Sequence, residues 1–232
     1  MNAPAFTVDV GNSSVGVARW EAGVPHLERH ERPEDAAALL AGDVAIVSVS
    51  PPRLARLLAA LPPVARARVL REAPAGLGPA ELLHSAGADR LAVALALQPG
   101  PAVAVDAGTA VTIEVVDCSG RYAGGFIAPG PAAGLAGLAQ ATAQLPHLDA
   151  QAAPLLPGTS TRAALLAGAW GLAVGGVDRL VEAALAALGG AQGVRIVATG
   201  GWGAAWLRDS HLRGIELDRA LVHHGIRRWA GT

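Results

Sequence analysis

Three stretches of the chain are apolar runs of strand length, and each ends in a glycine turn. They cover residues 6–14 (Phe-Thr-Val-Asp-Val-Gly-Asn-Ser-Ser), 103–110 (Val-Ala-Val-Asp-Ala-Gly-Thr-Ala) and 195–201 (Arg-Ile-Val-Ala-Thr-Gly-Gly). A short apolar run bounded by Gly and hydroxyl residues predicts a buried strand followed by a turn. A fourth strand is expected over residues 45–50.

Helical spacing of apolar residues predicts helices between these strands. We expect them over residues 53–61, 91–97 and 165–188, the last as one or two helices. The last segment is so rich in Ala, Leu and Gly that it must be buried on more than one side, which favours a partner subunit. Strands that alternate with helices predict an α/β fold.

The first two strand–turn segments match position by position: apolar, apolar, Asp, apolar, Gly, polar, small. Their aspartates, Asp9 and Asp106, lie about half a chain length apart, which indicates an internal duplication of one α/β unit. Chance similarity of two short stretches is the alternative. The cluster Pro99-Gly100-Pro101, which breaks regular structure just before the second Asp segment, marks the junction between two domains. We therefore expect domains at residues 1–101 and 102–232, the second carrying a dimer interface.

Composition narrows the functional classes. The net charge is −1, with 16% charged residues and no basic run, so we expect no nucleic-acid partner. The N-terminus lacks a signal core and Gly or Pro interrupts the longer apolar runs, so we expect no membrane partner and a cytoplasmic location. With Cys118 as the single cysteine, the chain has neither an intrachain disulfide nor a multi-cysteine zinc site.

The sequence contains no lysine, since all eighteen basic residues are arginine. That excludes a P-loop, a protein-kinase strand lysine and Schiff-base chemistry. No Gly-x-Gly-x-x-Gly turn follows any of the three strands, which disfavours a dinucleotide-dependent oxidoreductase.

The two Asp turns suit a nucleotide phosphate. Glycine lets the backbone approach closely, and successive N–H groups form a nest for anionic oxygens. Ser13, Ser14 and Thr109 add hydroxyl donors, whereas each aspartate must face a cation or its water. Two such turns from related half-domains would clamp one nucleotide, and ordinary β-turns capped by Asp and Asn are the alternative.

Gly87-Ala88-Asp89-Arg90 opens the apolar helix expected from Leu91. By spacing alone, the simpler interpretation of Asp89 is a residue that interacts with the helix dipole. The functional interpretation makes Asp89 a general base for a substrate hydroxyl, with Arg90 holding the substrate or the transferring phosphate.

Six short motifs together resemble those of the type III pantothenate kinases, in the same order and over nearly the whole chain. They are Asp9-Val10-Gly11-Asn12-Ser13, Gly87-Ala88-Asp89-Arg90, residues 106–112, residues 124–130, Ser160-Thr161 and Thr199-Gly200-Gly201. The resemblance implies duplicated ribonuclease-H-like domains of the actin-like ATPase superfamily, with mixed sheets flanked by helices. It also implies ATP-dependent phosphorylation of pantothenate to 4'-phosphopantothenate, the first step of coenzyme A biosynthesis.

The resemblance implies roles for individual residues. ATP, carrying Mg²⁺, would contact Asp9, Val10, Gly11, Asn12, Ser13, Ser14, Val15, Gly16 and Thr109. Pantothenate would contact Gly87, Ala88, Asp89, Arg90 and Thr161, with Asp89 as the catalytic base. Asp106 would bind a monovalent cation, K⁺ or NH₄⁺, and the enzyme would be a homodimer.

Four positions depart from the family pattern. Ser13 stands where the family usually has Thr and Ser160 where it has Asn, while Ala80 replaces a pocket tyrosine and Val93 an asparagine. The motif positions for ATP are thus retained in chemical type, whereas those for the substrate are altered. The alternatives left open are a weak enzyme, a kinase of a related small hydroxylated metabolite, and a non-catalytic regulatory factor on the same fold.

Overall fold

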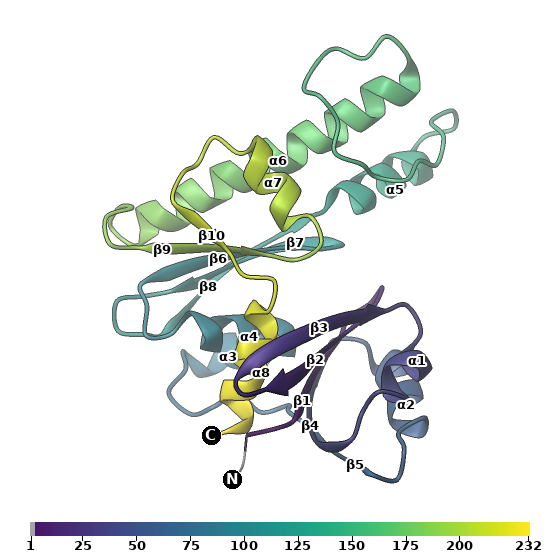
Figure 1. The fold of residues 1–232 in the computed structure, drawn as a ribbon. Coiled ribbons are helices and arrows are strands. Elements are labelled where there is room, and N and C mark those ends of the chain that lie inside the picture. Colours follow the sequence, from purple (N-terminus) through teal and green to yellow (C-terminus); the bar gives the residue numbers. More distant parts are fainter. Residues whose placement is uncertain (1–2) are drawn as a thin grey trace. The chain divides into compact units, whose positions relative to one another are not determined.

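A computed structural model describes residues 3–232 as two five-stranded mixed sheets flanked by helices (Figure 1). The strands of the first sheet are β1 (Phe6–Val10), β2 (Val15–Glu21), β3 (Val24–His30), β4 (Gly42–Ser48) and β5 (Ala65–Val69). Those of the second are β6 (Ala102–Ala107), β7 (Ala110–Val116), β8 (Tyr122–Pro129), β9 (Arg195–Thr199) and β10 (Ile215–Leu217). The helices are α1 (Pro33–Ala37), α2 (Pro51–Ala59), α3 (Ala80–Ser85), α4 (Ala88–Leu97), α5 (Pro131–Ala141), α6 (Thr161–Ala187), α7 (Gly203–Asp209) and α8 (Leu221–Ala230).

The two sheets have the same strand order. The first runs β3-β2-β1-β4-β5, and the second, in the corresponding direction, runs β8-β7-β6-β9-β10. In both, the first strand in sequence is central and pairs in parallel with the fourth, which pairs in parallel with the fifth. The duplication predicted from the two Asp segments is confirmed, because β1 and β6 occupy equivalent positions.

The chain divides into two compact units, each with one of the sheets. The first extends to Gly100 and also contains residues 116–123 and 219–232, and the second contains residues 101–115 and 124–218. The sequence-based division at residue 101 is contiguous, whereas here the C-terminal helix α8 packs within the first unit. It does so because its apolar side, including Leu221, Ile226 and Trp229, is buried against α4, β1 and β4.

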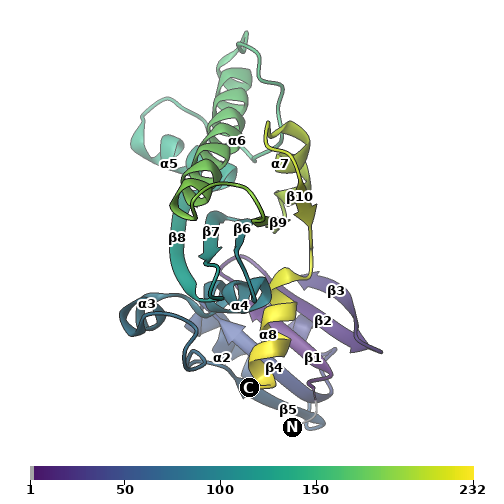
Figure 2. The same cartoon turned by 90° about the vertical axis from the view of Figure 1, so that its left-hand side faces the viewer.

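The first sheet is covered on both faces. Phe6, Val8 and Val10 of β1 point into a core shared with α1 and α2. The alternate residues of β1, Thr7 and Asp9, face α8, because successive side chains of a strand point to opposite sides. Helices α4 and α8 lie side by side (Figures 1 and 2).

In the second unit, α6 and α7 pack on one face of the second sheet. Trp170 and Trp206 are buried there with the valines of β6. Helix α6 is a single helix of 27 residues, where the sequence predicted one or two. Ser160 caps its N-terminus, since its hydroxyl accepts the Ala163 N–H at 3.2 Å.

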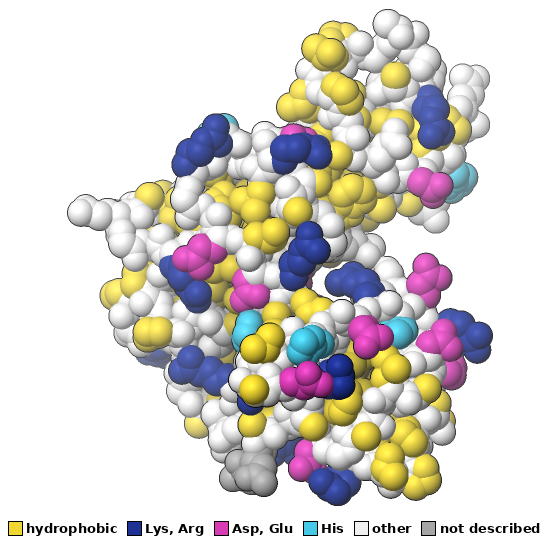
Figure 3. Space-filling view, in the orientation of Figure 1, with side chains coloured by type: hydrophobic (Ala, Val, Ile, Leu, Met, Phe, Trp, Pro, Cys, Tyr) yellow, Lys and Arg dark blue, Asp and Glu magenta, His cyan; other side chains and the backbone are white. Residues whose placement is uncertain are grey.

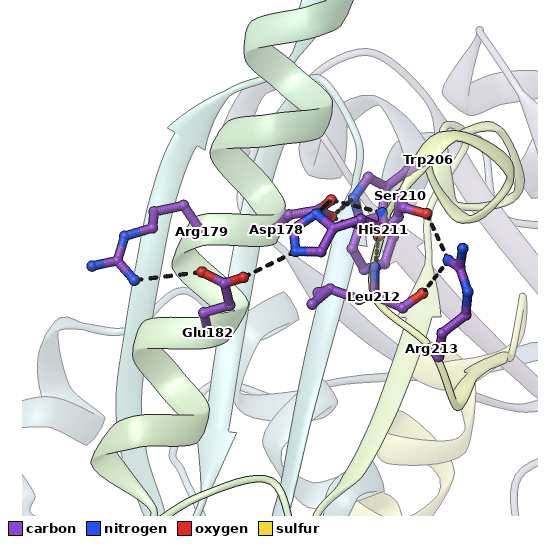
Figure 4. A network of polar contacts seen from close by, with 8 residues as sticks. All are labelled: Asp178, Arg179, Glu182, Trp206, Ser210, His211, Leu212 and Arg213. Carbon is purple, nitrogen blue, oxygen red and sulfur yellow. Dashed lines mark hydrogen bonds and ion pairs between the residues drawn. The ribbon is translucent and has the colours of Figure 1, made fainter.

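A polar network fastens α6 to the segment between α7 and β10 (Figure 4). Asp178 is only 2% exposed and accepts hydrogen bonds from Trp206 Nε1 at 2.9 Å and Ser210 Oγ at 2.7 Å. His211 bridges Asp178 and Glu182, at 2.8 and 3.0 Å. The contact with Glu182 raises the pKa of His211 above its usual value, so the bridge is strongest when the imidazole is protonated.

Candidate functional site

The first Asp turn joins β1 to β2. The Gly11 N–H donates to the Ser14 carbonyl at 3.0 Å, which closes the turn over residues 11–14. Asn12 and Ser13 are exposed at its tip, so their backbone and side-chain donors are accessible to a ligand. The turn is anchored from β4, since Ser48 Oγ donates to the Val10 carbonyl at 3.4 Å.

Asp9 lies at the penultimate position of β1, directly opposite Gly16 of β2. A Cβ at position 16 would lie 3.9 Å from the Asp9 Cβ and 3.2 Å from Nε2 of His223. His223 is 4% exposed on α8, and its Nδ1 lies 3.1 Å from Thr7 Oγ1. Glycine at position 16 thus lets the imidazole pack against the strand pair that carries Asp9.

Asp89 lies in the first turn of α4. Its Oδ1 accepts the Arg90 N–H at 2.7 Å, so the contact expected of an acidic residue at a helix N-terminus is present. Gly87 makes room for this carboxylate, because a Cβ there would lie 2.7 Å from Asp89 Oδ1 and 3.2 Å from Val49 Cγ1. Burial raises the pKa of Asp89 despite the Arg90 N–H, which makes the ionised carboxylate a better proton acceptor.

The second Asp turn, between β6 and β7, is enclosed by glycines from elsewhere in its unit. Gly130 donates its N–H to the Thr109 carbonyl at 3.0 Å, and a Cβ there would lie 2.7 Å from that oxygen. Gly200 has φ +83°, and a Cβ there would collide with Asp106 Oδ1 and lie 2.6 Å from the Ala107 carbonyl oxygen. Gly130 and Gly200, one from each of two motifs, therefore shape this turn, and Thr109 is exposed at its tip.

Thr161 begins α6 and lines a groove of about 630 Å³ between α5 and α6. The other residues that line the groove are all Gly, Ala, Leu, Pro or Val, among them Leu138 and Leu172. Ser160 rather than Thr161 is the helix cap, so the Thr161 hydroxyl is not needed for capping.

The predicted residues therefore fall into separate groups. Residues 9–16 and 87–90 belong to the first unit, and Asp106, Thr109 and Thr161 to the second. Sequence reasoning missed His223 and Arg29 of β3, whose Nη1 donates to Ser14 Oγ at 3.3 Å. The spacing of Leu221, Val222, Ile226 and Trp229 was a signal for α8 and its inward-facing histidine, whereas only the strand register identifies Arg29.

Comparisons with known proteins agree on one family. The family profile described as type III pantothenate kinase matches residues 5–183. The chain belongs to the type III pantothenate kinase family. A type III pantothenate kinase of Thermus thermophilus is 34% identical over 85% of this chain and 87% of that protein, and one of Dehalococcoides mccartyi is 29% identical over 91% and 92%.

A solved structure supports the fold. A conserved putative Baf family transcriptional activator from Campylobacter jejuni superposes with a TM-score of 0.64 at 19% identity, covering 97% of both chains. The similarity shows a shared fold, and the two mixed sheets flanked by helices agree with the actin-like ATPase fold that the family resemblance implied. As a type III pantothenate kinase, the chain is a small-molecule kinase that phosphorylates pantothenate with ATP in coenzyme A biosynthesis.

Proposed function

We propose that this kinase uses the two Asp turns for ATP and the N-terminus of α4 for pantothenate. The observation that carries the assignment is the repeated position of Asp9 and Asp106, each at the penultimate residue of the central strand of its sheet. Residues 9–16 and Thr109 would contact the nucleotide, because glycine turns with exposed hydroxyl groups present N–H and O–H donors to phosphate oxygens.

Asp89 would accept the proton of the pantothenate hydroxyl as that oxygen attacks the γ-phosphorus. Its partly buried carboxylate and raised pKa suit a proton acceptor, and its neighbour Arg90 provides a cation for the substrate or the transferring phosphoryl group. Gly87, Ala88 and Thr161 would complete the contacts with pantothenate. Phosphoryl transfer depends mainly on positioning and charge, so one base and a few donors are sufficient.

Asp106 is our candidate ligand for a monovalent cation, K⁺ or NH₄⁺. The fit rests on its oxygens, because Asp106 Oδ1 and the Ala107 carbonyl oxygen both lie beside Gly200, and hard cations prefer oxygen ligands. No group of three or more His, Cys, Asp or Glu within residues 3–232 is arranged to hold a metal ion. Mg²⁺ would therefore arrive with ATP, neutralise phosphate charge, and face Asp9 through water.

The groove between α5 and α6 is our candidate surface for a homodimer. Leu172 is 79% exposed and Leu138 42% exposed, and hydrophobic side chains reach the surface of this unit (Figure 3). Helix α6 is long and apolar enough to cross a bilayer by length and composition alone, a property that buried core helices share. For a soluble metabolic kinase of the cytoplasm, a second copy of this chain is the partner we expect to cover the groove.

One assay addresses the activity and a second the assembly. Purified protein with Mg²⁺-ATP and pantothenate should form 4'-phosphopantothenate, faster with K⁺ than with Na⁺ at equal ionic strength. Absence of product at saturating substrates would favour a regulatory role instead. Sedimentation equilibrium should give a dimer mass for the parent and a monomer mass for Leu172→Glu, and a monomeric parent that still turns over would refute the dimer.

A further inference from the structure

Arg29 belongs to a row of residues that crosses three strands of the first sheet. Asp9 of β1 pairs with Gly16 of β2, and Gly16 pairs with Arg29 of β3. Residues directly opposite one another in a sheet project to the same face. Because Gly16 has no side chain, no group from β2 stands between Asp9 and Arg29 on that face, and the imidazole of His223 packs over the glycine.

The guanidinium is directed to the first Asp turn. Its Nη1 donates to Ser14 Oγ at 3.3 Å, and Ser14 closes the turn through its carbonyl. Arg29 is exposed, and none of the ion pairs formed within residues 3–232 includes it. Its charge is thus held beside the turn by a neutral hydroxyl, and no carboxylate neutralises it.

His223 shows that this positive charge reaches across the same face. Burial lowers the pKa of His223 to about 4, and the positive charges of His224 and Arg29 add to the effect. At neutral pH the imidazole is therefore uncharged, and Arg29 is the permanent cation on β1–β3 beside the turn. In a chain without lysine, arginine is the only side chain that stays cationic at every physiological pH, and its planar fork matches phosphate oxygens.

We propose that Arg29 binds the β- or γ-phosphate of the nucleotide, with Ser14 holding its guanidinium in place before the nucleotide arrives. The proposal rests on the assignment of residues 9–16 as the ATP turn, and it adds a ligand from the neighbouring strand. The ligand class is a nucleoside di- or triphosphate, because a nucleoside without phosphates offers the guanidinium no anionic oxygen.

Arg29→Gln tests this role, with Arg19→Gln as the matched control. Arg19 is an exposed strand arginine of the same sheet, paired with Glu21 at 2.6 Å and distant in register from the turn. Loss of a charge-assisted contact should weaken ATP binding in calorimetry by about tenfold or more. Adenosine binding should stay the same, the ATP KM should rise while the pantothenate KM stays within about twofold, and Arg29→Lys should recover part of the loss.

Asp9→Asn separates failure of this inference from failure of the ATP assignment. If Arg29→Gln binds ATP like the parent while Asp9→Asn changes ATP binding, the turn is correct and Arg29 is not a ligand. If neither variant alters ATP binding, the nucleotide site lies elsewhere. The proposal would also be overturned if Arg29→Gln weakened the binding of ATP and of adenosine equally, or if Arg19→Gln weakened ATP binding as much. Neither pattern requires a contact between Arg29 and a phosphate.

Discussion

Replacing Asp89 by Asn should lower the catalytic rate, while the stability of the fold should stay the same or rise. In the parent, the Arg90 nitrogen lies 2.7 Å from Asp89 Oδ1. The Oδ1 of an asparagine can accept the same N–H, so the N-terminus of α4 should remain intact. What is lost is the proton acceptor. General-base catalysis contributes about 10²–10⁴-fold, so kcat should fall by that factor, which corresponds to a barrier about 3–5 kcal/mol higher.

The stability of the same variant should be equal to that of the parent or higher at neutral pH. Burial raises the pKa of Asp89, so the folded state disfavours the ionised form relative to the unfolded state. A group with a raised pKa stabilises the fold below its unfolded pKa, and this contribution is lost as the pH rises through the folded pKa. The asparagine side chain carries no charge to bury, so the advantage of the variant over the parent should grow from pH 4 to pH 7.

The assay combines initial rates of phosphopantothenate formation, ATP calorimetry and thermal unfolding at pH 4 and pH 7. Asp35→Asn is a matched control, because Asp35 is an exposed acidic residue in the first turn of α1. Turnover near the parent value would refute Asp89 as the base and leave only its contact with the helix N-terminus. A melting temperature lower than that of the parent at pH 7 would refute the argument from burial.

Three further changes test other residues. Asp106→Ala should abolish the difference in rate between K⁺ and Na⁺, because the cation loses its anionic ligand; an unchanged response would place the cation elsewhere. Thr161→Val should raise the pantothenate KM more than the ATP KM. The loss should correspond to up to about 1–3 kcal/mol, the cost of leaving a buried polar group of the substrate unpaired. Equal effects on both KM values would remove Thr161 from the substrate site. The folded pKa of about 4 for His223, against 6.5 ordinarily, predicts that the parent loses up to about 3 kcal/mol of unfolding free energy between pH 7 and pH 4. Denaturant titrations at both pH values should show a smaller loss in His223→Gln than in His224→Gln, the exposed neighbour.

The sequence pattern was sufficient to predict those strands that are buried on both faces. Every residue of the central strands β1 and β6 is buried except the half-buried aspartates, so a short, mostly apolar run identified them. Edge strand β3 was missed because it is largely exposed and carries His26, Glu28 and Arg29 without clear alternation. Its position is fixed by pairing with β2, and such pairing is a tertiary property that a short window of sequence does not contain.

The same limit explains which site residues were found. Asp9 and Asp106 occur in recognisable turns, and Asp89 occurs at a helix start, so each has a local signal. His223 reaches Thr7 from more than two hundred positions away, and its neighbours in sequence gave no sign of that contact.

The duplicated turns have diverged in what surrounds each aspartate, and this divergence supports different ligands for the two. On the β2 and β3 side of Asp9 lie Gly16 and then the guanidinium of Arg29, with the imidazole of His223 packed over Gly16, so the permanent charge there is positive. On the β9 side of Asp106, Thr199 pairs with the aspartate, and Gly200 after it leaves room for both Asp106 Oδ1 and the Ala107 carbonyl oxygen, so this side is rich in oxygen. Positive charge favours phosphate oxygens and clustered oxygens favour a metal cation. In our proposal, the duplicated aspartates would thus serve the phosphate site in one sheet and the cation site in the other.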